Sequence, residues 1–459
     1  MSSEQREARE LVLLDELIRK CSRNSICVVE GFKLQLDRGY SPEPEEVRYV
    51  SALMGGPTKK VDTLKSTYID VFTRLLEKNC YYFNSKSLCI YSWSPRVPVR
   101  YFPVSLDATG TIIALDEDGV SLLAYPTHRT YDLEGRGVEL PDPERMRVVE
   151  VTSRIDGYQI TFYFNPLLDK WIPATRYALH NMRYMKSRVI MEDLGNITNP
   201  YAAVADHIAS SKGLYDRIEH LRGWTLTFVL EAPEPAIVKP NVELYDYESF
   251  RLYLVNARNP EGHLLTTYES SQLVSWDHVP IEKVEVSTAP ELKKFVEMWS
   301  WDIYHRSRFV RFLSQDQVRP YTIEVRSKLY ENAVYIKHSS DPKSLLILAS
   351  HGLDDKAVEL LIDYRDIKSV GKEICELYKT LRKLVSETLS LPILEEAMRD
   401  MRVPRDLFWE LEKARRSGDI ERFSRKLSLA LASENIYDTR EKLKAFIASL
   451  TRHLESRAA

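Results

Sequence analysis

The hydrophobic period of the chain changes twice, and this change constrains the fold more than any other feature. Residues 4–21 and 60–78 repeat apolar side chains at helical spacing. From about 86 to 330, short runs rich in Val, Ile, Tyr, Phe and Thr are separated by Asp, Gly, Asn and Pro. From about 340 onward the helical period returns. The pattern predicts an α+β fold: a mostly antiparallel, strand-rich body followed by an all-helical C-terminal domain.

The central region is expected to be strand-rich because its runs are short and rich in β-branched and aromatic residues. The runs are SLCIYSW (87–93), GTIIAL (110–115), VSLLAY (120–125), YQITFYF (158–164), WTLTFVL (224–230), RLYLVNA (251–257), RFVRFL (308–313) and YTIEVRS (321–327). Asp-Gly within LDEDGVSL (115–122) predicts a hairpin, and NPEGHLL (259–265) predicts a similar turn. Helical segments are expected near 200–221 and 290–300.

The domain boundaries follow the changes of period. We expect a mainly helical N-terminal region at 1–85, a strand-rich domain at 86–338 and an all-helical domain at 339–459. In the last domain, apolar stripes recur on single helix faces. The two stripes are Ile374, Leu377, Tyr378, Leu381, Leu384 and Val385, and Leu443, Phe446, Ile447, Leu450 and Leu454. Pro342, Pro392 and Pro404 mark helix starts or breaks.

Charge and cysteine content restrict the partners. Lys plus Arg number 64 against 67 Asp plus Glu, a formal charge of −3, so a nucleic-acid site must be a local patch. The charged start MSSEQREARE and the lack of a long apolar run predict no membrane contact and a cytoplasmic protein. Five cysteines, Cys21, Cys27, Cys80, Cys89 and Cys375, lack CxxC spacing. We therefore expect buried free thiols and no metal site.

Several enzyme classes are excluded by missing motifs. The chain has no GxxxxGK[ST] phosphate loop, no GxGxxG after a strand, no HExxH and no GxSxG. What remains is an ordered series of short segments. It runs through LDATGTIIALDEDG (106–119), LLAYPTHRTYDLEG (122–135), TSRIDGYQITFYF (152–164), IPATRYAL (172–179), GWTLTFVLEAPEPAIV (223–238), RLYLVNARNPEGHLLTTYE (251–269), RFVRFL (308–313), TIEVRSKLYENAVYIKH (322–338) and DPKSLLILASHGLDDKAVELL (341–361).

This order resembles the RNA ligase 1 type of phage ATP-dependent RNA ligases over roughly residues 100–361. The resemblance implies a nucleotidyltransferase domain with an antiparallel sheet pocket for ATP. Members of the family transfer AMP to a lysine of a KxDG motif, then to an RNA 5′-phosphate. The matching tetrapeptide here is Arg154-Ile155-Asp156-Gly157. A guanidinium stays protonated and is not a nucleophile, so Arg154 can hold a phosphate but cannot be adenylated.

Other positions of the implied pocket also depart from the family pattern. Thr109 stands where the family has an arginine, and Arg129 and Asp132 stand for a lysine and an asparagine. Val229 replaces the ribose-binding glutamate, and Glu231 lies two residues on, on the same strand face. The complete degenerate pocket is Thr109, Arg129, Asp132, Arg154, Asp156, Gly157, Arg176, Val229, Glu231, Arg306, Glu324 and Arg326.

The substitutions near the end of the pocket are complementary in charge. Arg306-Ser307 matches a family Glu-Gly pair, while Glu324 and Arg326 match two phosphate-binding lysines. We therefore predict a cross-strand ion pair between Arg306 and Glu324 that fills the former triphosphate site. An unfilled pocket exposes costly polar groups, so it must be closed by its own side chains or hold a different ligand. The sequence leaves both possibilities open.

No other lysine is expected to replace the nucleophile. Lys170 in LLDKWIPATR is interpreted as a solvated turn residue, and Lys368, which begins KSVG, lies in the helical domain. Two basic and aromatic segments could contact RNA, MRYMKSRVIM (182–191) and HRSRFVRF (305–312). Their cations are Arg183, Lys186, Arg188, Arg306, Arg308 and Arg311. The alternative is that the apolar members belong to the core and the cations form a solvated face.

Three functions remain open. The first is an RNA-ligase-like protein that has lost ligation and binds RNA or RNA ends without catalysis and without a cofactor. The second is an active RNA ligase or nucleotidyltransferase with an altered mechanism, which requires ATP and Mg. The third is a subunit of a larger assembly that contacts a protein partner through the helical C-terminal domain. The sequence favours them in this order.

Overall fold

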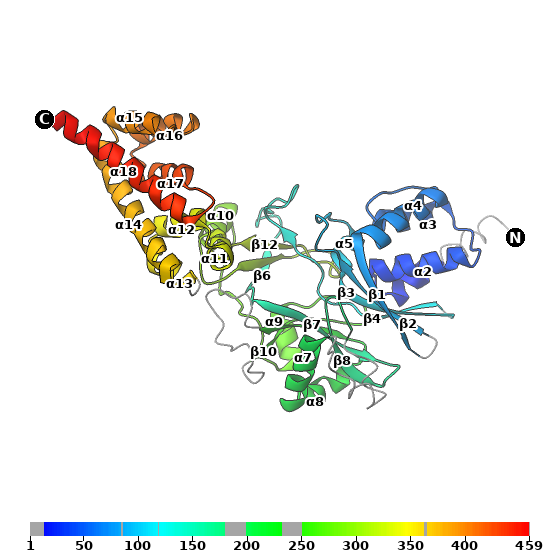
Figure 1. Cartoon of the computed structure of the whole chain (residues 1–459). Coiled ribbons are helices and arrows are strands. Elements are labelled where there is room, and N and C mark those ends of the chain that lie inside the picture. Colours follow the sequence, from blue (N-terminus) through cyan, green and yellow to red (C-terminus); the bar gives the residue numbers. More distant parts are fainter. Residues whose placement is uncertain are drawn as a thin grey trace. The chain divides into compact units, whose positions relative to one another are not determined.

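The computed structural model describes residues 13–83, 86–117, 119–179, 199–231, 250–361 and 365–458. The chain divides into two compact units. The first unit comprises residues 1–297 and 307–326, and the second comprises residues 298–306 and 327–459. The first holds mostly antiparallel sheets and the second is helical, which confirms the predicted α+β fold (Figure 1).

The N-terminal region is helical, as its apolar period predicts. Residues 13–20 form an α-helix. It is followed by α2 (Ser25–Asp37), α3 (Pro44–Leu53), α4 (Val61–Ile69) and the π-helix η1 (Asp70–Leu75). The predicted helix at 60–78 ends three residues early, because strand β1 (Leu76–Phe83) begins at Leu76. Phe32, Val50 and Phe72 are buried and anchor these helices in one core with the first sheet.

Two disulfides correct the expectation of free thiols. Cys21 bonds to Cys27 across the start of α2, and Cys80 bonds to Cys89. Cys80 lies on β1 and Cys89 on β2 (Lys86–Trp93), and the register sets them directly opposite each other. Cys375 is a buried free thiol, as expected.

The strands of the first unit form three four-stranded sheets among the described residues. The first has the order β1-β2-β3-β4, the second β10-β9-β7-β8 and the third β5-β12-β11-β6. Their remaining bounds are β3 (Thr109–Asp116), β4 (Gly119–Ala124), β5 (Tyr131–Asp132), β6 (Val148–Ser153), β7 (Gly157–Asn165), β8 (Lys170–Thr175), β9 (Thr225–Glu231), β10 (Arg251–Arg258), β11 (Ser307–Phe312) and β12 (Thr322–Arg326).

Each of the eight predicted strand runs coincides with a strand to within one residue at either end, and β3 pairs with β4 as the Asp-Gly hairpin signal predicts. The other helices of this unit are α5 (Pro103–Asp107), α7 (Pro200–Ser211), α8 (Leu214–Ile218), η3 (Glu219–Leu221) and α9 (Thr267–Val274). Helix α10 (Ala289–Ser300) crosses the boundary between the units. The helices near 200–221 and 290–300 are therefore confirmed.

The first two sheets pack face to face through alternating side chains. Leu88 and Ile90 of β2 contact a core that includes Tyr163 of β7 and Ile172 of β8. The intervening residue Cys89 belongs to the helical core on the other face of the first sheet. Successive strand residues point to opposite faces, so the first sheet is buried on both sides. Helices α7 and α8 cover the outer face of the second sheet (Figure 1).

A buried carboxylate ties the N-terminal helices to the sheets. Asp107 is fully buried and accepts hydrogen bonds from the Ser25 backbone N–H at 2.8 Å and the Tyr125 hydroxyl at 2.6 Å. Arg319 donates to both carboxylate oxygens, at 2.9 and 2.7 Å. Burial alone would raise the pKa of Asp107, but Arg319 and these hydrogen bonds hold it below its ordinary value.

The second unit consists of helices with the predicted apolar faces. They are α11 (Lys328–Ser339), α12 (Pro342–Ser350), α13 (Asp354–Leu360), α14 (Arg365–Thr388), α15 (Ile393–Asp400), α16 (Asp406–Ser417), α17 (Ile420–Leu431) and α18 (Ile436–Ala458). Ile374, Leu381, Leu443 and Phe446 are fully buried. Pro342 and Pro392 stand at the starts of α12 and α15, as predicted. In the described ranges, no helix is long and apolar enough to cross a bilayer.

The Asp107 ion pair yields a stability prediction. Arg319→Ala leaves a fully buried carboxylate without its counter-charge, so we expect the free energy of unfolding to fall by about 3–5 kcal/mol. The matched control is Arg74→Ala, because Arg74 pairs with Asp70 on an exposed surface; it should change stability by less than about 0.5 kcal/mol. Urea denaturation followed by circular dichroism measures both. Equal losses in the two variants would contradict the prediction.

Candidate functional site

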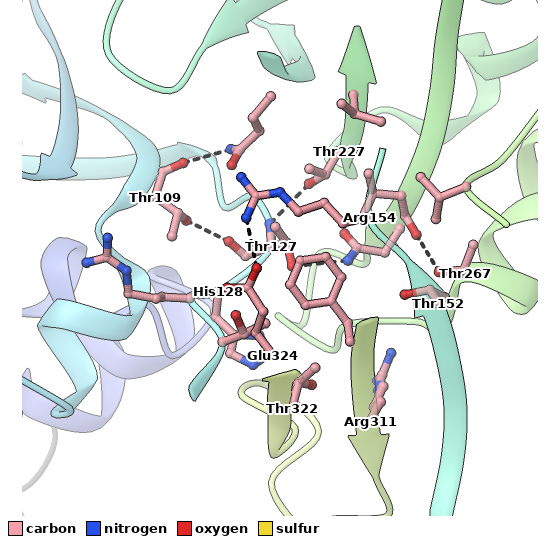
Figure 2. A pocket seen from close by; sticks show the side chains of 18 of the residues that line it. Thr109, Thr127, His128, Thr152, Arg154, Thr227, Thr267, Arg311, Thr322 and Glu324 are labelled. Carbon is pink, nitrogen blue, oxygen red and sulfur yellow. Dashed lines mark hydrogen bonds and ion pairs between the residues drawn. The ribbon is translucent and has the colours of Figure 1, made fainter. Parts of the chain in front are cut away.

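A cavity of about 580 Å³ opens inside the first unit, and all three sheets contribute to its walls. Thr109 of β3, Thr227 of β9 and Arg311 of β11 line it from different sides. Figure 2 shows these side chains converging on one space, with Arg154 and Glu324 between them. The volume lies within the range of small-molecule sites in proteins.

Arg154, which the sequence resemblance aligns with a nucleophilic lysine, lines this cavity. It follows β6 directly, and its backbone N–H donates to the Ser307 carbonyl at 3.0 Å. Its Nη1 donates to Glu324 Oε1 at 2.8 Å, the contact drawn in Figure 2. The Ser307 hydroxyl donates to the same oxygen at 2.7 Å. Burial would raise the pKa of Glu324, but Arg154 and Ser307 lower it below its ordinary value.

A second ion pair neutralises another cavity arginine. Arg326 Nη2 lies 2.9 Å from Asp132 Oδ2, and Arg326 Nε lies 3.9 Å from Glu324 Oε2. Strand β12 pairs in parallel with β5, which sets Glu324 opposite Asp132 and brings these side chains together. The charges of Arg154 and Arg326 are therefore balanced within the protein itself.

Arg129 and Arg176 are different, because neither forms an ion pair in the described part of the chain. Arg129 Nη1 and Arg176 Nε and Nη2 are buried without a hydrogen-bond partner. Burial and the nearby charge of Arg176 lower the pKa of Arg129 to about 10. Burial also lowers the pKa of Arg176. Two half-buried like charges destabilise each other unless an anion compensates them.

Hydroxyl and amide groups form the uncharged wall of the cavity. The Thr127 backbone N–H donates to the Thr227 hydroxyl at 3.0 Å, and Asn256 Nδ2 donates to the Thr127 hydroxyl at 3.1 Å. Gln159 Nε2 donates to the Thr109 carbonyl at 2.8 Å. These bonds link β3, β7, β9 and β10, so the wall is held in place by four strands.

His128 contributes a neutral ring to this wall. Its Nε2 lies 2.8 Å from the Pro320 carbonyl, and burial lowers the pKa of His128 to about 3. The ring therefore carries no charge near neutral pH, and Nε2 is the protonated nitrogen that donates to the carbonyl. In the described structure Nδ1 is buried without a partner.

Most of the sequence-predicted pocket residues line this one cavity. They are Thr109, Arg129, Asp132, Arg154, Gly157, Arg176, Val229, Glu324 and Arg326. Asp156, Glu231 and Arg306 do not line it. Gly157 is needed because a Cβ there would lie 2.0 Å from the Leu230 carbonyl oxygen, so the close approach of β7 to β9 requires glycine.

The predicted cross-strand pair of Arg306 and Glu324 is wrong. The register of β11 and β12 sets Phe309 opposite Glu324, and Arg306 precedes β11. The carboxylate of Glu324 pairs instead with Arg154, which directly follows β6, the strand on the far side of β11 in the third sheet. Sequence alignment could not reveal this partner, because it depends on β6 lying beside β11 in the third sheet.

The basic segment 305–312 is not an exposed cationic face. Arg308 is buried and its Nε lies 2.9 Å from Glu282 Oε1. Arg311 lines the cavity and donates to the backbone carbonyls of Leu264 and Leu265. The other predicted RNA contacts, Arg183, Lys186 and Arg188, lie outside the described residues.

The lining set also contains residues that the sequence did not single out. Among them are His128, Gln159, Thr127, Thr227, Asn256 and Arg136. Thr127 and His128 directly precede Arg129 in a segment of the resemblance. Their place near the cavity could therefore have been predicted from the position of Arg129 in the sequence.

The cavity contains arginine but no lysine among its described lining residues. Six arginines and three carboxylates line it, an excess of three positive charges. Lys170 begins β8 and Lys368 lies on α14 in the second unit; neither lines the cavity. No group of three or more His, Cys, Asp or Glu side chains suitable for a metal occurs in the described ranges.

Comparison with known proteins gives distant structural similarities. No protein-family model and no curated protein matches the chain. An archaeal ATP-dependent RNA ligase is 11% identical, with a TM-score of 0.35, over 69% of this chain and 79% of the ligase. A Naegleria gruberi RNA ligase with pyrophosphate is 10% identical, with a TM-score of 0.29, over 58% of this chain and 98% of that protein. A variant of that ligase with AMP and Mn is 10% identical, with a TM-score of 0.30, over 56% and 98%.

The Arg154–Glu324 pair gives the stability of the protein a specific pH dependence. The folded pKa of Glu324 lies below its ordinary value of 4.5. The contribution of the ionised carboxylate to the free energy of unfolding is therefore complete above about pH 4.5. It is lost as the pH falls through the lower, folded value. We expect Glu324→Gln to lower the free energy of unfolding at pH 7 by about 2 kcal/mol, discounted for the partial exposure of Arg154.

Urea denaturation from pH 7 to pH 3 measures this effect. The difference between wild type and Glu324→Gln should shrink as the pH falls below 4.5. Glu285→Gln, at an exposed position of the same unit, is the control and should leave the pH profile unchanged. A constant difference at every pH would show that the carboxylate charge is not responsible.

Proposed function

We propose that the cavity binds the phosphate-bearing end of an RNA strand and that the protein does not catalyse ligation. The observation that carries the proposal is the pair of half-buried arginines, Arg129 and Arg176, which line the cavity with buried guanidinium nitrogens that have no hydrogen-bond partner in the described structure. A phosphate monoester would supply the missing negative charge. Guanidinium groups suit this task, because their fixed fork of donors matches the oxygens of a phosphate.

The absence of ligation is supported by the chemistry of the same wall. Transfer of AMP through a covalent intermediate requires an amine that can lose its proton. No described residue lining the cavity is a lysine, and Arg154 at the expected position forms an ion pair with Glu324. The carboxylate of Glu324 would also repel a triphosphate at the position where the family uses a lysine.

RNA is proposed as the ligand because of the segment order. The succession from LDATG to DPKSLLILAS resembles RNA ligases, whose pocket meets a 5′-phosphorylated strand. The hydroxyl and amide wall of Thr127, Thr227 and Asn256 offers donors and acceptors for ribose and base edges. The cavity is therefore proposed to recognise an RNA end rather than to capture a nucleotide covalently.

Binding should depend on the terminal phosphate. We expect a 5′-phosphorylated single-stranded RNA 12-mer to bind about tenfold more tightly than the same strand with a 5′-hydroxyl, because a charge-assisted contact contributes about 1.5 kcal/mol. Arg129→Gln and Arg176→Gln should each abolish this preference. Arg74→Gln, at an exposed position, is the matched control. Fluorescence anisotropy measures the affinities, and equal affinity of wild type for both strands would contradict the proposal.

The same variants should be more stable in the absence of phosphate. Removing one of two half-buried like charges relieves repulsion, so we expect Arg176→Gln to raise the free energy of unfolding by up to about 1 kcal/mol in phosphate-free buffer. Urea denaturation in such a buffer measures it. A marked loss of stability would indicate that Arg176 has a structural partner instead.

A labelling experiment tests the lack of catalysis. Incubation of the pure protein with α-labelled ATP and magnesium should give no covalently labelled band after denaturing electrophoresis, because the cavity wall presents no amine among its described residues. An active RNA ligase treated in the same way serves as the positive control. A labelled band, or AMP found on the polypeptide by mass spectrometry, would support the ligase alternative.

A further inference from the structure

The Cys80–Cys89 disulfide differs from the other disulfide in its access to solvent. Cys80 lies on β1, the edge strand of the first sheet, and is exposed, whereas Cys89 on β2 is buried. Cys21 and Cys27 are both fully buried. A thiol in solution therefore has access to Cys80 in the folded chain, while the Cys21–Cys27 bond is shielded from it.

The opposite face of β1 holds a turn that carries a cavity arginine. Successive strand residues point to opposite faces, so Asn79 and Cys80 lie on different faces of β1. Asn79 Nδ2 donates to the Tyr177 carbonyl at 2.8 Å. Tyr177 directly follows Arg176, which lines the cavity. The hydrogen bond from Asn79 thus fixes the backbone next to Arg176.

A second anchor for this turn comes from β2. The Ser92 hydroxyl donates to the Arg176 carbonyl. The turn itself is closed by the Thr175 backbone N–H, which donates to the Ala178 carbonyl at 3.0 Å. The strands that the disulfide joins, β1 and β2, are therefore also the strands that hold residues 175–178 (Figure 1).

The disulfide reinforces a single row of strand pairing. In the described part of the chain β1 pairs with β2 alone, because it is the edge of its sheet. Two paired strands are marginally stable by themselves, and a cross-link restricts their open conformations. Opening of the disulfide therefore lets β1 separate from β2 more often, and each separation releases Tyr177 from Asn79.

We propose that Cys80–Cys89 is a redox-active site that exchanges with dithiols and thereby controls how firmly Arg176 is held at the cavity. A thiolate of the dithiol attacks the exposed Cys80 sulfur, and Cys89 leaves as a thiolate that takes up a proton. The second thiolate of the dithiol then displaces Cys80, which is protonated in turn. The protein gains two thiols, and the dithiol, which has lost two protons and two electrons, becomes a disulfide.

The exchange reaction is tested on the full chain without a cavity ligand. The folded protein is treated with dilute dithiothreitol, quenched with an alkylating reagent at successive times and digested for mass spectrometry. We expect Cys80 and Cys89 to be alkylated at least about tenfold faster than Cys21 and Cys27, because a buried bond reacts only when the structure opens. Equal rates for the two disulfides, or reduction only in denaturant, would overturn the proposal.

Hydrogen exchange tests the coupling to the turn, again without a ligand. The backbone amides of residues 76–83 and 175–178 should exchange faster in the double variant Cys80→Ser, Cys89→Ser than in wild type. Cys375→Ser is the matched control, because Cys375 is a free thiol in the second unit; it should leave both segments unchanged. Unchanged exchange of residues 175–178 in the double variant would contradict the control of Arg176.

The effect on affinity rests on the proposed function and is measured separately. Reduction of Cys80–Cys89 should weaken binding of the 5′-phosphorylated RNA strand about fivefold, the effect of one lost hydrogen bond. Asn79→Ala should weaken it equally in the oxidised protein, and reduction should then have no further effect, because both changes break the same contact.

Additive losses in the reduced Asn79→Ala variant would overturn the proposed route from the disulfide to the cavity. If wild type binds no phosphorylated strand, the proposed function fails. The alkylation rates and the hydrogen exchange of residues 175–178 still decide whether the disulfide is redox-active and coupled to the turn.

Discussion

The buried ion pair of Asp107 and Arg319 is the interaction on which the first unit depends. Asp107 lies at the end of α5, receives the first backbone N–H of α2 and is bound by Arg319 from the segment between β11 and β12. A fully buried carboxylate is destabilising unless several donors surround it. The native fold therefore requires all three segments to be in place around Asp107. Because Thr109 follows Asp107 by two residues, the same contact fixes the start of β3 and with it one wall of the cavity.

The cavity combines the two possibilities that the sequence left open. Part of its charge is balanced internally, because Glu324 and Asp132 neutralise Arg154 and Arg326. The other part, at Arg129 and Arg176, is unbalanced in the described structure and the cavity retains a volume of about 580 Å³. A pocket that had simply been closed by its own side chains would show neither property. These two properties are the reason for proposing an anionic ligand.

The local sequence patterns predicted the strands and helices well, but they could not predict which distant segments pair with each other. Alternating apolar residues revealed β2, β7 and β9, and the resemblance brought nine residues of one cavity together. The disulfide between Cys80 and Cys89 was missed because β1 lies within residues 1–85, which were predicted to be mainly helical, so its pairing with β2 was not considered. The partner of Glu324 was missed for a similar reason: sheet order, which no local signal encodes, selects Arg154.

If the cavity binds an anion as proposed, the unbalanced arginines would couple the supply of this ligand to the lifetime of the folded chain. Any anion that occupies the cavity of the native state and not the unfolded chain shifts the folding equilibrium by mass action, by about 2.7 kcal/mol at a concentration one hundred times its Kd. A chain synthesised where its ligand is scarce would spend more time open to proteolysis than one that is saturated. Because of the repulsion between Arg129 and Arg176, the amount of folded protein in the cell would rise and fall with the concentration of the ligand.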